Sequence, residues 1–210
     1  MAETWRATAK AHRRQQLLDA AAHLFAERGF NGVSIEELGA AAGVSGPALY
    51  RHFPSKEAML GELLIGASQR LLEGCTRILA EEVAAEQTLR DLVDFHVDFA
   101  LSERDVIRIQ DRELASLPTE ANREVRMLQR RYVQEWVGLV ARLSPTTPTA
   151  EIEVRVHAIF GLLNSTPHNA RLVDVDDARG VLAGMAIGGM LGAGTTVTAG
   201  TTVTTVTTGN

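Results

Sequence analysis

The sequence is poor in the residues and motifs that support disulfides, metal sites and membrane spans. Its 210 residues include a single cysteine, Cys75, which excludes an internal disulfide and is typical of a reducing compartment. It contains no H-x-x-x-H pair and no cysteine cluster, so we expect no metal and no cofactor. The apolar stretch 181–193 is shorter than the roughly twenty residues that span a bilayer, so we expect no membrane partner. The N-terminus has no apolar core of the kind found in signal peptides, which predicts a cytoplasmic protein.

The motifs of common enzyme classes are also missing. There is no G-x-S-x-G turn, no phosphate-binding loop and no Cys/His pair at a telling spacing. We therefore expect a protein that is not an enzyme. A helical hydrolase that uses His96 or His157 stays an alternative.

Residues 34–56 carry the local signals of two short helices joined by a turn. Ser34 and Glu37 fit the capping box S-x-x-E, which predicts a helix that starts one residue after the serine. Gly43 suits the left-handed conformation that ends a helix, and Ser45 followed by Pro47 predicts a new start. Two helices joined by a turn of three or four residues that contains glycine are typical of a helix-turn-helix.

The second of these helices is short, and its outward face is the candidate for reading DNA. Leu49 and Phe53, four residues apart, are expected to anchor it to the core. Hydroxyls, cations and helix-start amides position a protein on phosphates, whereas side chains in the groove read base edges. We predict phosphate contacts from Ser34, Tyr50, His52 and Lys56, base contacts from Arg51, Ser45 and Gly46, and Pro47 on the same outward face.

Five segments carry the signature of a known family: 18–21, 24–30, 33–35, 41–45 and 49–56. Together they resemble the DNA-binding domain of the TetR family of bacterial repressors. The resemblance implies an all-helical homodimer whose short third helix enters the major groove of a double-stranded DNA operator. It also implies a larger C-terminal domain that holds a small-molecule inducer. Pro47 departs from the family pattern, which more often has a hydrogen-bond donor there, so one base or phosphate contact is expected to be missing.

The distribution of charge is the one expected for a DNA-binding head attached to an acidic body. Residues 1–56 contain seven Lys and Arg against five Asp and Glu, a balance of +2, and the other residues carry −7 of the total of −5. Arg6, Lys10, Arg13 and Arg14 lie ahead of the first predicted apolar stripe. They either add phosphate or minor-groove contacts or form an exposed, frayed terminus.

Helical periodicity continues through the rest of the chain, and no window before the tail alternates strongly enough to predict a strand. The pattern predicts helices over 56–85, 88–102, 105–117 and 119–143, and a further helix from Thr149 that ends or kinks at Pro167. We predict an all-α protein with three parts. These are a three-helix helix-turn-helix domain (1–56), a helical bundle for ligand binding and dimerisation (57–194) and a Thr/Val/Gly-rich low-complexity tail (195–210).

Polar residues inside these apolar helices are the candidates for ligand binding. His157, Gly161, Asn164 and His168 follow at spacings of four, three and four, which would place them on one helix face. A buried polar group without a partner costs about 1–3 kcal/mol, so each needs a bound molecule, a water chain or the other subunit. We predict ligand contacts from His96, Arg108, Arg112, His157, Asn164 and His168; a satisfied place in the core or interface is the alternative.

A second resemblance concerns the class of ligand. The segments 105–118, 128–132 and 160–168 are similar to a subgroup of TetR regulators linked to acyl-CoA and lipid breakdown. The resemblance implies a small hydrophobic inducer, an acyl-CoA or a fatty acyl group. Its tail would lie in the apolar bundle and its polar end near Arg108 or Arg112.

The last predicted helix carries glycine at every fourth position. Gly180, Gly184, Gly188 and Gly192 form a smooth ridge that lets another helix approach closely. Each glycine costs up to about 1 kcal/mol of helix propensity, so the series predicts a compensating contact. We predict a homodimer interface made by this ridge and the 152–163 helix, including Ile159 and Leu163.

These observations favour a dimeric, ligand-released repressor that binds a palindromic operator. A ligand-independent architectural DNA-binding protein is the main alternative, although it would not need so large a helical body. A helical enzyme is the second alternative.

Overall fold

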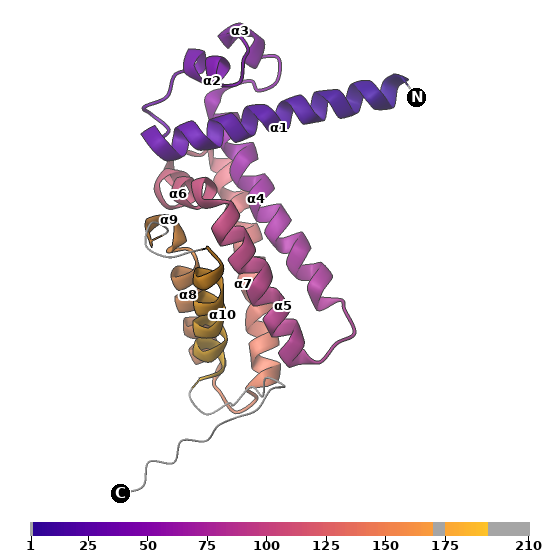
Figure 1. Cartoon of the computed structure of the whole chain (residues 1–210), viewed down its shortest axis with the longest axis vertical. Coiled ribbons are helices and arrows are strands. Elements are labelled where there is room, and N and C mark those ends of the chain that lie inside the picture. Colours follow the sequence, from indigo (N-terminus) through magenta and orange to yellow (C-terminus); the bar gives the residue numbers. More distant parts are fainter. Residues whose placement is uncertain (1, 170–174, 193–210) are drawn as a thin grey trace, which may run out of the picture.

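The computed structural model describes residues 2–169 and 175–192, and all of its regular elements are helices (Figure 1). Helices α1 (Ala2–Arg28), α2 (Ile35–Ala41) and α3 (Gly46–Leu49) form a head at one end of the molecule. The body consists of α4 (Lys56–Leu79), α5 (Ala85–Ser102), α6 (Arg104–Glu113), a 3-10 turn η1 (Leu114–Ser116), α7 (Thr119–Leu143), α8 (Thr149–Leu163), α9 (Thr166–Asn169) and α10 (Val175–Leu191). The predicted all-α class is confirmed. The predicted tail lies outside the described residues.

One long helix, α4, joins the head to the body and contributes to both hydrophobic cores. Its first half buries Met59, Leu60 and Leu64 in the head core, which also takes in Ile109 of α6 and Val125 of α7. Its second half belongs to the body core through Leu72, Cys75 and Ile78. Core packing therefore continues across residue 56, and the domain boundary placed there stays a prediction.

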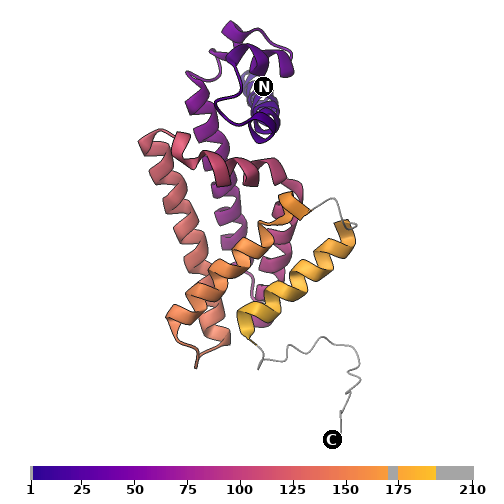
Figure 2. The same ribbon diagram turned by 90° about the vertical axis from the view of Figure 1, so that its left-hand side faces the viewer.

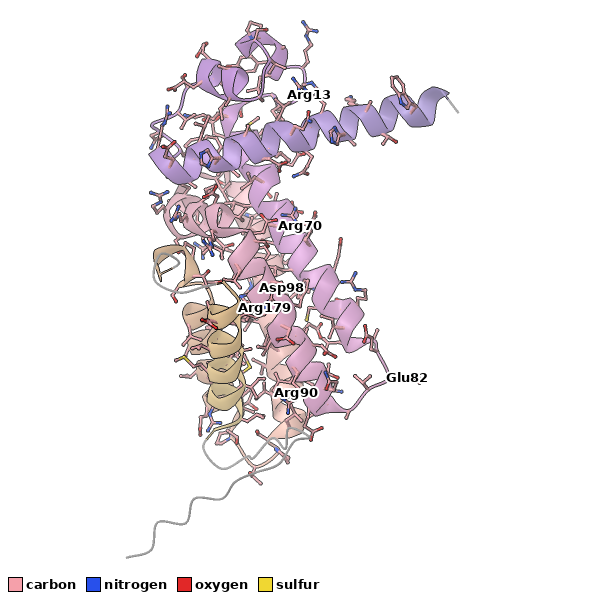
Figure 3. All side chains as sticks on the ribbon, in the orientation of Figure 1. Arg13, Arg70, Glu82, Arg90, Asp98 and Arg179 are labelled. Atoms are coloured by element: carbon pink, nitrogen blue, oxygen red, sulfur yellow. The ribbon has the colours of Figure 1, made fainter. Side chains whose placement is uncertain are left out.

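The body is a bundle in which α5, α7, α8 and α10 surround fully buried Trp136. Aliphatic side chains at helical spacing supply the rest of this core. An ion pair between Arg179 and Asp98 fastens α10 to α5 at the surface (Figure 3). A pocket beside His96 is lined by residues of α4, α5, α6, α7 and α8.

The helix predicted over 56–85 is six residues too long. It ends at Leu79, and the amide of Ala80 closes its last turn onto the carbonyls of Thr76 and Arg77. Glu81 and Glu82 follow directly, and carboxylates are unfavourable at the negative end of the helix dipole. The predicted helices 88–102, 105–117 and 119–143 agree with α5, α6 with η1, and α7 to within a few residues.

The helix that begins at Thr149 also ends earlier than predicted. Its last residue is Leu163, with Asn164 as the C-cap, so Pro167 does not end it. Pro167 lies instead in the first turn of the short α9, where a missing backbone N–H does no harm. The polar stripe predicted from His157 to His168 is therefore divided between two helices.

Candidate nucleic-acid interface and ligand pocket

The predicted capping box starts α2. The Ser34 hydroxyl accepts the Glu37 N–H at 3.2 Å, and the Ser34 N–H donates to the Glu37 carboxylate at 2.8 Å. The Ser34 hydroxyl also donates to that carboxylate at 2.8 Å. These hydrogen bonds lower the pKa of Glu37, with a smaller contribution from Arg28. The predicted phosphate contact of Ser34 stays a prediction, and to make it the hydroxyl must exchange Glu37 for the phosphate.

Two glycines shape the turn between α2 and α3. Gly43 has φ +67°, the left-handed conformation predicted from its position. Gly39 is needed for a different reason, because a Cβ there would lie 2.8 Å from the Val44 carbonyl and 3.0 Å from the Gly46 nitrogen. The backbones of α2 and the turn touch at this point, so Gly39 sets how closely α3 approaches. The role of Gly39 was not predicted, although a glycine inside a short predicted helix often marks a close backbone contact.

Helix α3 presents an exposed face beyond its two anchors. Leu49 and Phe53 are each 1% exposed, which confirms that they hold the helix to the core. Tyr50 is 53% exposed, and Ser45, Pro47 and Arg51 are also exposed. Ser45 is the N-cap residue, yet its hydroxyl makes no capping hydrogen bond. The outward placement of these side chains is confirmed, and their contacts with DNA stay predictions.

Gly46 differs from its neighbours because it is buried. A Cβ at this position would lie 3.6 Å from Ile35 and 3.7 Å from a Glu36 carboxylate oxygen, so Gly46 faces α2 and not outward. The expectation that it shares the exposed face is wrong. The close packing of two short helices across a tight turn brings the first residue of α3 against α2.

His52 and Lys56 are half-buried and partly committed to the head itself. The Lys56 ammonium donates to the carbonyls of Phe30 and Val33, at 2.8 Å each, and lies 4.3 Å from the centre of the Phe30 ring. An ammonium has three donors, so one N–H is left for the predicted phosphate contact. The Nδ1 atom of His52 is buried and has no hydrogen-bond partner among the described residues.

Arg13 and Arg14 do not belong to a flexible N-terminal arm, because α1 is already helical from Ala2. Arg13 donates to the Ala42 carbonyl at 3.0 Å and so caps the end of α2 (Figure 3). Arg14 forms an ion pair with Glu62 of α4, donates to the His52 carbonyl and lies 4.1 Å from the centre of the Phe53 ring. Both guanidiniums hold α2 and α3 in place, which corrects the expectation of free phosphate contacts at these two positions.

The body contains a pocket of about 260 Å³ in which His96 is central. The His96 ring packs beside Tyr132 and Phe160, with ring centres 5.8 and 5.0 Å away, and these two rings are 5.5 Å from each other. Its nitrogens bond to the Tyr132 hydroxyl at 3.0 Å and to the Asn164 side-chain oxygen at 3.2 Å. Because an amide oxygen only accepts, Nε2 carries the proton and Nδ1 accepts from Tyr132. The predicted residues His96, Asn164 and His157 all line this pocket, with His157 exposed at its edge.

Burial keeps His96 uncharged. Removal from water lowers the pKa of His96 to about 4, against a small opposing effect of the Asn164 hydrogen bond. Burial also raises the pKa of the Tyr132 hydroxyl. The pocket therefore offers hydrogen bonds without charge, which suits a neutral polar group such as a carbonyl.

The lowered pKa of His96 makes the protein sensitive to acid. Between about pH 6.5 and 4 the unfolded chain binds a proton that the folded chain does not, so stability is complete above this window and falls as the pH drops through it. The loss is about 3 kcal/mol in total. Urea unfolding across this pH range should show that His96→Phe, whatever its absolute stability, has a flatter pH dependence than the wild type. Equal slopes would contradict the assignment.

The remaining predicted ligand residues lie elsewhere. Arg108 donates to the Pro167 carbonyl at 2.8 Å, and Arg112 donates to the Ala26 carbonyl at the end of α1. Both line a separate hollow of about 400 Å³ between α1 and α6, so they do not join the His96 pocket as predicted. The second resemblance placed the ligand's polar end near Arg108 or Arg112, whereas Gln110 is the α6 residue that lines the His96 pocket. The side chain of His168 lies outside the described part of the structure.

Helix α6 also connects the body to the head. Next to Arg112, the Glu113 carboxylate accepts the Phe30 N–H at 3.0 Å, just after α1 ends. His23 of α1 lies 3.3 Å from the Asp105 carboxylate at the start of α6. A displacement of α6 would therefore be transmitted to the end of α1 and to the loop that precedes α2.

The outer face of α8 and α10 is the candidate dimer surface (Figure 2). Gly180, Gly184 and Gly188 have open space where a Cβ would stand, so this part of the ridge is exposed. Exposed apolar side chains accompany the ridge: Val154 (69%), Val181 (60%) and Met185 (52%).

Three residues predicted at the dimer interface face inward. Ile159 and Leu163 are 7% and 0% exposed within one chain, and Ile159 packs onto Gly189, where a Cβ would lie 2.7 Å away. Gly192 has φ +77° beside the Arg155 guanidinium and ends α10. The exposed part of the ridge agrees with the prediction, whereas Ile159 and Leu163 were assigned to a partner although α8 packs onto α10 of its own chain at Gly189.

Within residues 2–169 and 175–192 no three His, Cys, Asp or Glu side chains are grouped so as to hold a metal ion, and no helix has the length and apolar character to cross a bilayer. Cys75 is buried, which raises the pKa of its thiol to about 12 with a further contribution from Glu135. This thiol is therefore not a nucleophile at neutral pH.

Two short helices joined by a tight turn, the second with an exposed face, are typical of helix-turn-helix regulators, and here a helical body with an uncharged pocket carries them. The sequence matches two families of known proteins. Residues 17–63 match the family described as bacterial regulatory proteins, tetR family, and residues 82–168 match the tetracyclin repressor-like C-terminal domain. The chain belongs to the TetR family.

Individual relatives agree in fold. The transcriptional repressor KstR2 of Rhodococcus jostii is 33% identical over 139 residues, which cover 62% of this chain and 65% of the relative. The chain thus spans just under two thirds of that protein. A TetR-family regulator from Bordetella parapertussis superimposes with a TM-score of 0.75 at 24% identity, covering 85% and 93% of the two chains. FadR of Bacillus subtilis, solved in complex with stearoyl-CoA, gives a TM-score of 0.66 at 16% identity, covering 83% and 98%.

Proposed function

We propose that this protein is a cytoplasmic transcriptional repressor that binds a palindromic DNA operator as a homodimer and is released by an acyl-CoA or related lipid-derived ligand. The observation that carries the DNA-binding part is the exposed face of α3. Tyr50 and Arg51 project from a one-turn helix that Leu49 and Phe53 hold to the core. A helix of this kind enters the major groove with its exposed side chains toward the base edges.

The ligand part rests on the His96 pocket and on its connection to the head. An acyl ligand suits an aromatic-lined pocket with neutral hydrogen-bond donors and acceptors. A ligand that favours a bundle geometry with displaced α6 would shift the head through Arg112 and Glu113. The ligand can lower DNA affinity only by the ratio of its own affinities for the two geometries. The protein does not need to react with the ligand.

The test measures DNA binding and ligand release separately. Gel shifts and fluorescence anisotropy with DNA from upstream of the protein's own gene should show binding at least about 10³-fold tighter than to random DNA at the same salt. Adding saturated acyl-CoAs should release the operator without consuming the thioester. Absence of sequence preference would overturn the regulator assignment. Selective binding that is indifferent to every acyl-CoA would favour the ligand-independent alternative.

A further inference from the structure

A second hollow adjoins the His96 pocket on the surface between α7 and α8. This outer groove has a volume of about 590 Å³, and the two hollows share Gln129, Val133 and His157 as a common wall. Only these three side chains are known to separate the hollows, so a molecule held beside His96 that extends between them would reach the outer groove.

The two hollows differ in charge. The inner pocket is lined by neutral side chains, among them Ser68, Gln110 and Tyr132, and contains no Asp, Glu, Lys or Arg within the described residues. The outer groove contains two arginines, Arg126 and Arg130, against one acid, Glu153. A ligand that fits both must be uncharged at one end and anionic at the other.

The arginines retain donors for such an anion. Arg126 uses Nε to bind the Asn122 side chain at 2.8 Å, which fixes the guanidinium and leaves the N–H groups of its two terminal nitrogens. Arg130 is exposed one turn further along the same face of α7. Two guanidiniums four residues apart suit a phosphate or diphosphate better than a single carboxylate. In the shared wall, the buried amide nitrogen of Gln129 has no hydrogen-bond partner among the described residues.

We propose that the ligand is a phosphorylated acyl amphiphile that occupies both hollows, with its acyl group and carbonyl beside His96 and its phosphates at Arg126 and Arg130. This inference rests on the proposed function and assigns the anionic end of the ligand to α7. Arg108 and Arg112 are committed to backbone carbonyls in a separate hollow that also contains Glu27 and Asp111. A CoA thioester and a phospholipid share the proposed chemistry, and the test distinguishes them.

The test uses the full chain and measures binding by titration calorimetry. A series from butanoyl-CoA to palmitoyl-CoA identifies the preferred chain length, and the S-acylpantetheine and the lysophosphatidate of that length are then compared with it. We expect removal of the phosphates to weaken binding at least about tenfold at low salt, and added salt to reduce this difference. Stronger binding of the lysophosphatidate would identify a phospholipid as the source of the same chemistry.

Matched variants test whether the phosphates of the ligand bind at Arg126 and Arg130. The double variant Arg126→Gln/Arg130→Gln should lose about tenfold in affinity for the acyl-CoA and leave affinity for the acylpantetheine unchanged. Arg131→Gln is the control, because Arg131 is exposed on the same helix but does not line the groove. Thermal unfolding should be the same for all three proteins. If acyl-CoA binds the double variant as tightly as the wild type, the groove assignment fails and the proposed function stands. If no acyl-CoA binds the wild type, the acyl-CoA part of the proposed function fails with it.

Discussion

Replacing Gly184 with glutamate is expected to turn the protein into a monomer and to weaken operator binding by about 10²- to 10⁴-fold. Gly184 lies in the exposed glycine ridge of α10 beside Met185, and among the described residues no atom beyond its own helix backbone and chain neighbours lies within 4 Å of the added Cβ. The substitution places a charge where we propose that the partner's helices pack, and a buried unpaired charge prevents close association. Two heads that are no longer joined bind their half-sites independently.

A matched control separates loss of the dimer from loss of folding. Gly138 of α7 also has open space around its Cβ position and is not part of the glycine ridge of α10. Since glutamate forms helices better than glycine, Gly138→Glu should not lower the unfolding temperature. Gly184→Glu should lower it only by the contribution of the dimer, and its helix content should stay that of the wild type. Sedimentation should show a monomer for the first variant and a dimer for the second. A dimeric Gly184→Glu protein would place the interface elsewhere.

The head was predicted more completely than the body because its signals are local. The capping box at Ser34 and the left-handed glycine at Gly43 each depend on interactions within a few residues. The spacing of Leu49 and Phe53 also sufficed to show which face of α3 is buried. Gly46 was misplaced because its burial depends on how closely α2 approaches, and this is a tertiary contact.

The His96 pocket could not be predicted from the sequence, because contacts between distant parts of the chain form it. Periodicity placed His96 on an inner helix face, and the structure confirms that it is buried. Its partners Tyr132 and Asn164 are 36 and 68 residues away, and no pattern along one helix pairs them. The outer arginines were overlooked for the same reason, because Arg126 and Arg130 resemble a solvated helix face until α8 forms the other wall of the groove.

On α10, the exposed glycine ridge and the glycine that packs onto α8 are neighbours in the sequence. Successive positions of a helix differ by about 100°, so the ridge at Gly184 and Gly188 points outward while Gly189 receives Ile159 from α8. Spacing along the sequence identified the ridge, but it could not indicate which glycines face the chain's own neighbour.

Removing the Arg51 side chain should abolish most of the operator preference. Arg51 is exposed beside Tyr50 on the face of α3 that we propose enters the major groove. A bidentate arginine contact to guanine is worth about 1–3 kcal/mol, and a homodimer loses it at both half-sites, so Arg51→Ala should weaken operator binding by about 2–6 kcal/mol. Binding to random DNA should fall much less, because phosphate contacts from other residues remain.

Arg51→Lys distinguishes base reading from simple charge. Lysine keeps the positive charge but lacks the planar pair of donors that matches guanine. If Arg51 reads a base, the lysine variant should retain the salt dependence of the wild type and still lose most of its preference for the operator, as measured by anisotropy against a single-base operator series. If lysine restores full operator affinity, Arg51 contacts phosphate, and specificity must come from Ser45, Tyr50 or the shape of the DNA. The distinction decides whether this head recognises sequence through Arg51, just after α3, or through the way its short helix fits the groove.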